Sequence, residues 1–159
     1  MQKIKWDIPT CLLYRVLNIA GLLLLAGLVL YIALAWKALP EQVPSHYGLS
    51  GEADAWKGKN AVLFCPIVGI LVYALIAVVE RFPSLWNTGV TLTAENAMPV
   101  LFLLKGMLTF LKFTIALGFS YIGYCTAAAR SLGFWFLPVF LLLLFVPMAF
   151  YTLRVYRLR

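Results

Sequence analysis

The sequence predicts an all-α integral membrane protein, a four-helix transmembrane bundle with a short structured loop between the first two helices. Of the 159 residues, 64% are hydrophobic and 12% are charged, whereas a soluble domain is about 45 to 50% apolar. The mean hydropathy is +0.93. Long apolar runs fill most of the chain, and the one long polar stretch is residues 39–60. We expect a single domain over residues 1–159.

Four apolar runs are long enough, or nearly so, to cross a hydrocarbon core, which takes about 20 residues of helix. None alternates in polarity as the strand of a membrane barrel does, so helices are the expected spanning structure. The runs cover residues 16–36, 61–79, 113–129 and 132–153.

The first run also has features of a secretory signal. Lys3 and Lys5 precede it, and the small residues at 33–35 resemble a cleavage site. However, the run is longer than the apolar core of a signal peptide, which has about 7 to 15 residues. We therefore expect a retained membrane anchor over residues 16–36.

The polar segment 37–60 is predicted to be a folded loop. Pro40 and Pro44 fix their own backbone angles and favour extended conformations before them. Gly48 and Gly51 are typical of a turn, and the residues on either side can pair as a short hairpin.

The same segment supplies the candidate binding residues. Its polar groups surround the only histidine of the chain, and a divalent cation could bind through His46, Glu52 and Asp54. One histidine with carboxylates is a weak metal pattern, because strong ones have several nitrogen or sulfur ligands. A structured connector whose histidine bonds within the loop is the alternative. The candidate binding residues are Pro44, His46, Tyr47, Glu52, Asp54, Trp56 and Lys59.

The third helix is predicted to begin before its apolar run. Thr93 is a typical N-cap, which suggests a helix over residues 94–129 that exceeds the thickness of a membrane. In the fourth helix, 132–153, Pro138 and Pro147 predict kinks.

The candidate intramembrane charges are Glu80, Lys105 and Lys112. Small residues recur on the same faces of the second and third helices, which would allow close packing in lipid. The carboxylate at 80 could then pair with either lysine. An ionisable group at this depth suggests function, and a lysine that reaches the headgroups is the alternative.

The distribution of Lys and Arg predicts the orientation. An inward N-terminus leaves few basic residues outside, so we expect both termini in the cytoplasm, the 37–60 loop on the outer face, and a multi-pass protein. The net charge of +7 fits basic residues that meet anionic lipid, and nucleic acid is not an expected partner. The residues on the predicted inner side are Lys3, Lys5, Arg15, Arg81, Lys105, Arg154, Arg157 and Arg159.

The loop resembles a known bacterial family. The matching residues are Trp36, Leu39, Pro40, Val43 to Tyr47, Gly51, Asp54, Trp56 and Lys59, and a second, weaker match is Thr91 to Asn96. This pattern is similar to the signature of the family numbered 1648 among domains of unknown function, the N-terminal part of SdpI-like immunity and signalling proteins. The resemblance implies a helical protein of the bacterial cytoplasmic membrane.

These observations favour a non-enzymatic membrane protein that recognises a peptide, a lipid headgroup or a partner protein at the outer face, with an immunity, signalling or accessory role. A membrane-embedded enzyme that uses His46 and Asp54, with or without a metal, is one alternative. A small transporter that uses Glu80 and Lys112 is another, and would require a homo-oligomer or a second protein. Besides the low-probability metal, no cofactor is expected. The three cysteines are far apart and show no disulfide or zinc spacing.

Overall fold

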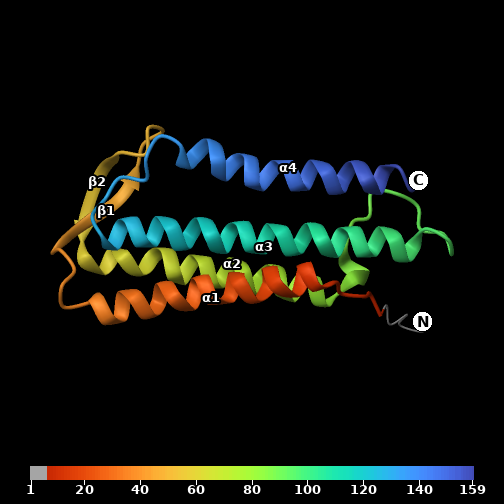
Figure 1. The fold of residues 1–159 in the computed structure, drawn as a ribbon, viewed down its shortest axis with the longest axis horizontal. Coiled ribbons are helices and arrows are strands. Elements are labelled where there is room, and N and C mark those ends of the chain that lie inside the picture. Colours follow the sequence, from red (N-terminus) through yellow and green to blue (C-terminus); the bar gives the residue numbers. More distant parts are fainter. Residues whose placement is uncertain (1–6) are drawn as a thin grey trace.

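The computed structural model describes residues 7–159 and shows a mostly helical chain. Four of its helices are long and apolar enough to cross a membrane, as predicted. A two-stranded antiparallel sheet lies at one end of the helices (Figure 1). The helices are α1 (Leu12–Ala35), α2 (Phe64–Arg81), α3 (Ala97–Ala127) and α4 (Phe136–Tyr156), the strands are β1 (Gln42–Tyr47) and β2 (Ala53–Gly58), and the short 3-10 helices are η1 (Lys59–Leu63) and η2 (Pro83–Leu85).

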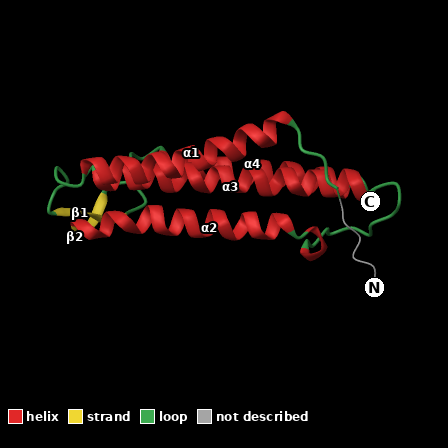
Figure 2. Cartoon of the chain, turned by 90° about the horizontal axis from the view of Figure 1, so that it is seen from below, coloured by secondary structure: helices red, strands yellow, loops and turns green. Residues whose placement is uncertain are grey.

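Helix α3 is the centre of the bundle, with α1 and α2 on one side and α4 on the other (Figures 1 and 2). Its 31 residues correspond to roughly 46 Å of helix, which exceeds a hydrocarbon core of about 30 Å. Most of the outward-facing side chains of α1, α2 and α4 are apolar. In a bilayer these surfaces face lipid.

Small residues allow α2 and α3 to pack closely, as predicted. A Cβ atom added at Gly69 of α2 would lie 2.9 Å from the Cβ of Phe119. One added at Gly123 of α3 would lie 3.1 Å from the Cβ of Cys65. Because any side chain at these positions would push the helices apart, the glycines set the separation of the two helices.

The loop between α1 and α2 is a hairpin, which confirms the sequence prediction. Strands β1 and β2 pair antiparallel, and a bulge at Ser45 sets Pro44 opposite Trp56 but His46 opposite Ala55. We call residues 42–58 the hairpin and their end of the bundle the hairpin end. The start of α1 and the end of α4 lie at the opposite, terminal end (Figure 1).

The hairpin is attached to the connection between α3 and α4. The Leu132 amide donates a 2.8 Å hydrogen bond to the Gly51 carbonyl. Gly51 and Gly133 both have a φ of +80°, and a Cβ at Gly51 would lie 3.0 Å from the Gly133 nitrogen. Only glycine fits at Gly51, because both its backbone angle and its surroundings exclude a side chain.

The starts of α2 and α3 differ from the prediction. Helix α2 begins at Phe64 instead of 61, because η1 continues from the hairpin, where the Lys59 amide bonds to the Glu41 carbonyl at 3.0 Å. Helix α3 begins at Ala97 instead of 94. The side chains of Thr93 and Asn96 each bond to the backbone amide of the other, at 3.2 and 2.8 Å, and this reciprocal turn precedes the helix.

The other helix bounds differ for similar local reasons. Helix α4 spans 136–156 instead of 132–153, because the left-handed backbone at Gly133 cannot continue a helix. Pro138 then falls in the first turn, where proline is tolerated, and Pro147 lies inside the helix. Helix α1 begins at residue 12, four residues earlier than predicted.

Candidate functional site

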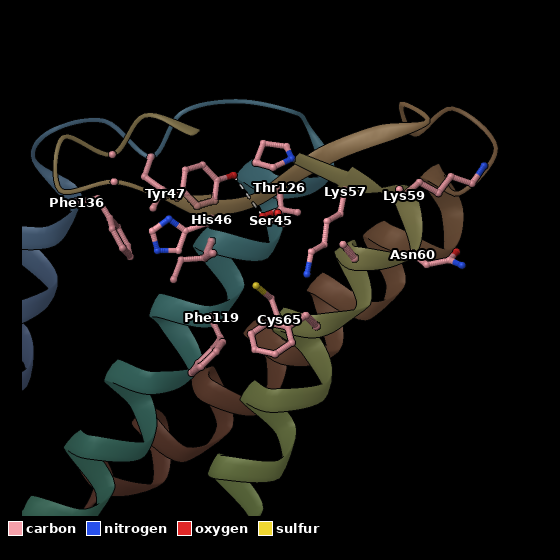
Figure 3. Close-up of a pocket in the computed structure, with 18 of the residues that line it drawn as sticks. Ser45, His46, Tyr47, Lys57, Lys59, Asn60, Cys65, Phe119, Thr126 and Phe136 are labelled. Carbon is pink, nitrogen blue, oxygen red and sulfur yellow. Dashed lines mark hydrogen bonds between the residues drawn. The ribbon is translucent and has the colours of Figure 1, made fainter. Parts of the chain in front are cut away.

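A cavity of about 1220 Å³ lies between the hairpin and the bundle. Figure 3 shows the hairpin above it, α2 and α3 beneath it and α4 beside it. This volume exceeds the 300 to 1,000 Å³ typical of small-molecule sites. The hairpin therefore covers a space large enough for a ligand.

The side of the cavity formed by the hairpin and η1 is polar, and the side formed by the helices is largely apolar. The polar lining groups are Glu41, Ser45, His46, Tyr47, Lys57, Lys59 and Asn60. The apolar lining groups on the helices are Phe64, Cys65, Phe119, Ile122, Phe136 and Leu137. Such a division suits an amphipathic ligand, since its polar part would contact the hairpin and its apolar part would contact the helices.

His46 and Asp54 form a close pair across the hairpin. The Nδ1 atom of His46 lies 2.6 Å from an Asp54 carboxylate oxygen, and the two side chains are 69% and 52% exposed. Two register shifts accompany this contact: Ser45 is unpaired before His46, and Asp54 is unpaired between Ala53 and Ala55. With Nδ1 engaged, Nε2 is the ring nitrogen that remains for a ligand or a proton.

Tyr47 attaches the hairpin to the end of α3. Its hydroxyl donates to the Arg130 carbonyl at 3.2 Å and lies 3.3 Å from the Thr126 hydroxyl oxygen. Burial raises the pKa of the Tyr47 phenol above its ordinary value, and the bond with Thr126 opposes this only in part. The phenol is therefore neutral at physiological pH and keeps the proton that it donates.

The two lysines near the cavity have different surroundings. Lys57 is opposite Val43 in the register, and Val43 is fully buried against the bundle. The Lys57 side chain is exposed and extends toward the helices, as Figure 3 shows. Lys59 instead lies 3.7 Å from a Glu41 carboxylate oxygen and 5.5 Å from the centre of the Trp36 ring.

The remaining predicted binding residues are dispersed. Pro44 of β1 is buried and lines the cavity. Trp56 on the opposite strand is 49% exposed and does not line the cavity. Glu52 contributes its main-chain carbonyl to the turn, where it accepts from the Gly48 amide at 2.9 Å. Within residues 7–159, no group of three His, Cys, Asp or Glu side chains could hold a metal ion. Glu52 is therefore not grouped with His46 and Asp54 among these residues, and a metal bound by the three side chains stays a prediction.

The sequence did not indicate the helical half of the cavity. Thr126, Phe119 and Phe136 lie far from the hairpin in sequence. In the sequence they look like any other residues of an apolar helix. Only their contacts with the hairpin distinguish them.

A second polar centre lies inside the bundle. Glu80 and Lys112 form an ion pair in which the side chains are 14% and 5% exposed, as the sequence predicted. The Lys112 ammonium also lies 5.4 Å from the centre of the Tyr73 ring. Lys105 does not take part, and donates instead to the Ile8 carbonyl at 3.0 Å and the Thr10 hydroxyl at 2.6 Å.

Comparison with known proteins gives one family. Residues 22–70 match the family described as Domain of unknown function (DUF1648). This range contains most of α1, the hairpin and the first part of α2. The chain is also similar to an uncharacterized protein of Archaeoglobus fulgidus, with 35% identity over 61 residues. That match covers 38% of this chain and only 33% of the relative's length. No solved structure matches significantly.

Proposed function

We propose that this chain is a non-enzymatic membrane protein that recognises a ligand at the outer face of the cytoplasmic membrane of a bacterium. The cavity under the hairpin supports this most directly. The hairpin lies within the segment that matches the family, and its polar face covers apolar helix surfaces that a ligand can contact. The three classes of ligand to distinguish are a peptide, a lipid headgroup and a partner protein.

The orientation in this proposal rests on the distribution of basic residues between the two ends. Within residues 7–159, six basic residues lie toward the terminal end of the bundle and four at the hairpin end. The six are Arg15, Arg81, Lys105, Arg154, Arg157 and Arg159, and the four are Lys37, Lys57, Lys59 and Arg130. An excess of Lys and Arg marks the cytoplasmic side. The hairpin end is then the outer face.

Cysteine labelling tests this orientation. Ser50 is exposed in the turn of the hairpin. In a variant without the three native cysteines, we expect Ser50→Cys to react with a membrane-impermeant maleimide in intact cells. Labelling only after lysis would show that the protein has the opposite orientation.

The resemblance to SdpI-like proteins favours an immunity, signalling or accessory role for the ligand site. In this role the hairpin binds a molecule at the membrane surface, and the chemistry of the ligand determines the outcome for the cell. The exposed His46–Asp54 pair and the neutral Tyr47 phenol supply polar contacts without any need for a reaction.

Photo-crosslinking in living cells tests whether the cavity selects a ligand. A benzophenone amino acid at Phe64, which lines the cavity and is 65% exposed, should form a discrete adduct. Leu34 of α1 is a matched control, because it lies at the same end, is 79% exposed and does not line the cavity. Mass spectrometry identifies the adducts. If both positions yield the bulk lipids in the same proportions, the cavity has no selectivity and the proposal is wrong.

The His46–Asp54 contact favours a second candidate, a membrane-embedded enzyme. A carboxylate at 2.6 Å from Nδ1 can orient the imidazole so that Nε2 accepts a proton from a nucleophile. Within residues 7–159, no hydroxyl or thiol is hydrogen-bonded to His46, so the nucleophile would have to be water or the substrate. Conversion of lipid in reconstituted vesicles, lost in His46→Ala, would favour this candidate over recognition alone.

A transporter is the third candidate and has less support. The groups that would handle an ion, Glu80 and Lys112, bind to each other in the interior. Transport would require them to separate at each cycle, with a high cost for each unpaired charge.

A further inference from the structure

Lys57 is the cationic side chain of the cavity that lacks a counter-ion. Among residues 7–159 it makes no ion pair and no side-chain hydrogen bond, whereas Glu41 faces Lys59 and Asp54 faces His46. Its side chain is exposed and extends toward the helices (Figure 3), so a ligand in the cavity can reach it. An ammonium group without a counter-ion can bind an anion through charge-assisted hydrogen bonds.

The apolar part of the cavity lies between two helices that hardly meet. Helices α2 and α4 both pack against α3 and have at most marginal contact with each other. Phe64 of α2, Phe119 of α3 and Phe136 of α4 all line the cavity. The space between α2 and α4 that these residues line is the gap through which we expect an acyl chain to enter from the bilayer.

The start of α2 adds to the positive potential. Phe64 and Cys65, its first two residues, line the cavity, and the first turn has no acidic residue and no side-chain cap. The N-terminal end of a helix has a partial positive charge that favours anions. Lys57 and this helix end therefore both make the electrostatic potential in the cavity more positive.

We propose that the cavity binds one anionic phospholipid, whose phosphate lies at Lys57 and whose acyl chains lie between α2 and α4. This inference rests on the proposed ligand-recognition function and names its ligand class. A net negative headgroup fits better than a zwitterionic one, because a choline or ethanolamine cation would lie near Lys57 and Lys59. Few carboxylates remain to bind such a headgroup cation, since Glu41 and Asp54 already face cations of the protein.

Native mass spectrometry of the full chain in neutral detergent tests this proposal. The protein is titrated with phosphatidylglycerol or with phosphatidylcholine of identical acyl chains. We expect one saturable phosphatidylglycerol molecule, bound about tenfold more tightly than phosphatidylcholine. Lys57→Gln should weaken phosphatidylglycerol binding by about ten- to a hundredfold, as expected for the loss of a charge-assisted hydrogen bond, and Lys57→Arg should retain most of it.

Lys37→Gln is the matched control, since Lys37 is exposed at the same end and does not line the cavity. It should bind as the wild type does. Thermal unfolding without added lipid confirms that Lys57→Gln is folded. Free glycerol phosphate should not compete, because it lacks the chains that occupy the gap, and efficient competition would overturn the lipid assignment.

Equal binding of the two lipids, or unchanged binding in Lys57→Gln, would also overturn the inference. The two proposals can fail separately. A discrete peptide or protein adduct at Phe64, together with no lipid selectivity, would retain ligand recognition and reject the anionic lipid.

Discussion

Two acid–base pairs in this molecule have similar contacts in opposite surroundings. His46 and Asp54 meet on the hairpin with more than half of each side chain exposed, whereas Glu80 and Lys112 meet inside the bundle with most of each side chain covered. An exposed ion pair adds about 0 to 1 kcal/mol to stability. Removing one partner from a buried pair costs about 3 to 5 kcal/mol. The hairpin pair is thus available to a ligand, and the interior pair holds the fold.

The largest effect is expected at the interior pair. Glu80→Gln leaves the Lys112 ammonium buried without a counter-ion, and should lower the free energy of unfolding by about 3 to 5 kcal/mol. Thermal unfolding in detergent measures the loss. Adding Lys112→Gln should restore part of it, because the unpaired charge is then gone. Strictly additive losses in this double-mutant cycle would show that the two groups do not interact.

The close packing between α2 and α3 should give the next largest effect. In Gly69→Ala, the new methyl group would meet Phe119 at 2.9 Å and a Leu25 methyl at 3.0 Å. Overpacking of this kind costs about 1 to 3 kcal/mol, measured by thermal unfolding. Gly27→Ala is the control, because nothing lies within 4 Å of its added Cβ, and it should not destabilise the protein. Equal effects of the two changes would argue against close α2–α3 packing.

A smaller effect is expected where the hairpin meets α3. Tyr47→Phe removes the bonds to Thr126 and the Arg130 carbonyl, at a cost of about 0.5 to 1.5 kcal/mol per bond. Hydrogen exchange of the β1 amides should become faster. Unchanged exchange would mean that other contacts fix the hairpin.

The same tyrosine predicts a pH dependence. The folded pKa of Tyr47 is raised above the ordinary value of 10.0. The folded protein therefore keeps this proton to higher pH than the unfolded chain, and the associated stability is complete below pH 10 and is lost as pH rises through the folded pKa. Thermal unfolding of the wild type should decline above pH 10 more steeply than that of Tyr47→Phe. Parallel declines would contradict this assignment.

The smallest effect on stability is expected at the exposed pair. His46→Gln and Asp54→Asn should each change the free energy of unfolding by no more than about 1 kcal/mol. The crosslinking yield at Phe64 should nevertheless fall if the pair contacts the ligand. A large loss of stability in either variant would remove the contrast between the two pairs, and would assign the hairpin pair a structural role.

The sequence predicted those features best whose residues lie close together along the chain. The prolines and glycines of segment 37–60 indicated the hairpin, because each fixes its own backbone angles. The pairing of Glu80 with Lys112 followed from helical spacing and similar depth. In contrast, the bulge at Ser45 was not predicted, and it determines which residue lies opposite His46.

The cavity itself could not be predicted. Apart from Phe64 and Cys65, its helical half comes from residues about 60 to 90 positions beyond the hairpin in sequence, and no local pattern records their contact with it. The start of α3 was also misplaced, since the reciprocal bonds of Thr93 and Asn96 form a turn before the helix. The apolar pattern of this helix is interrupted by Lys105, Thr109 and Lys112. Neighbouring elements supply the partners of the two lysines, and the Thr109 hydroxyl bonds to the Lys105 carbonyl of the same helix.

The contact of Gly51 with Gly133 links the hairpin turn mechanically to the α3–α4 connection. Helix α4 packs mainly against α3, so it can tilt with little loss of contact elsewhere. The bond from the Leu132 amide to the Gly51 carbonyl joins the base of this helix to the tip of the hairpin. A tilt of α4 would therefore move the hairpin, and a molecule that entered beside α4 would change the shape of the hairpin end.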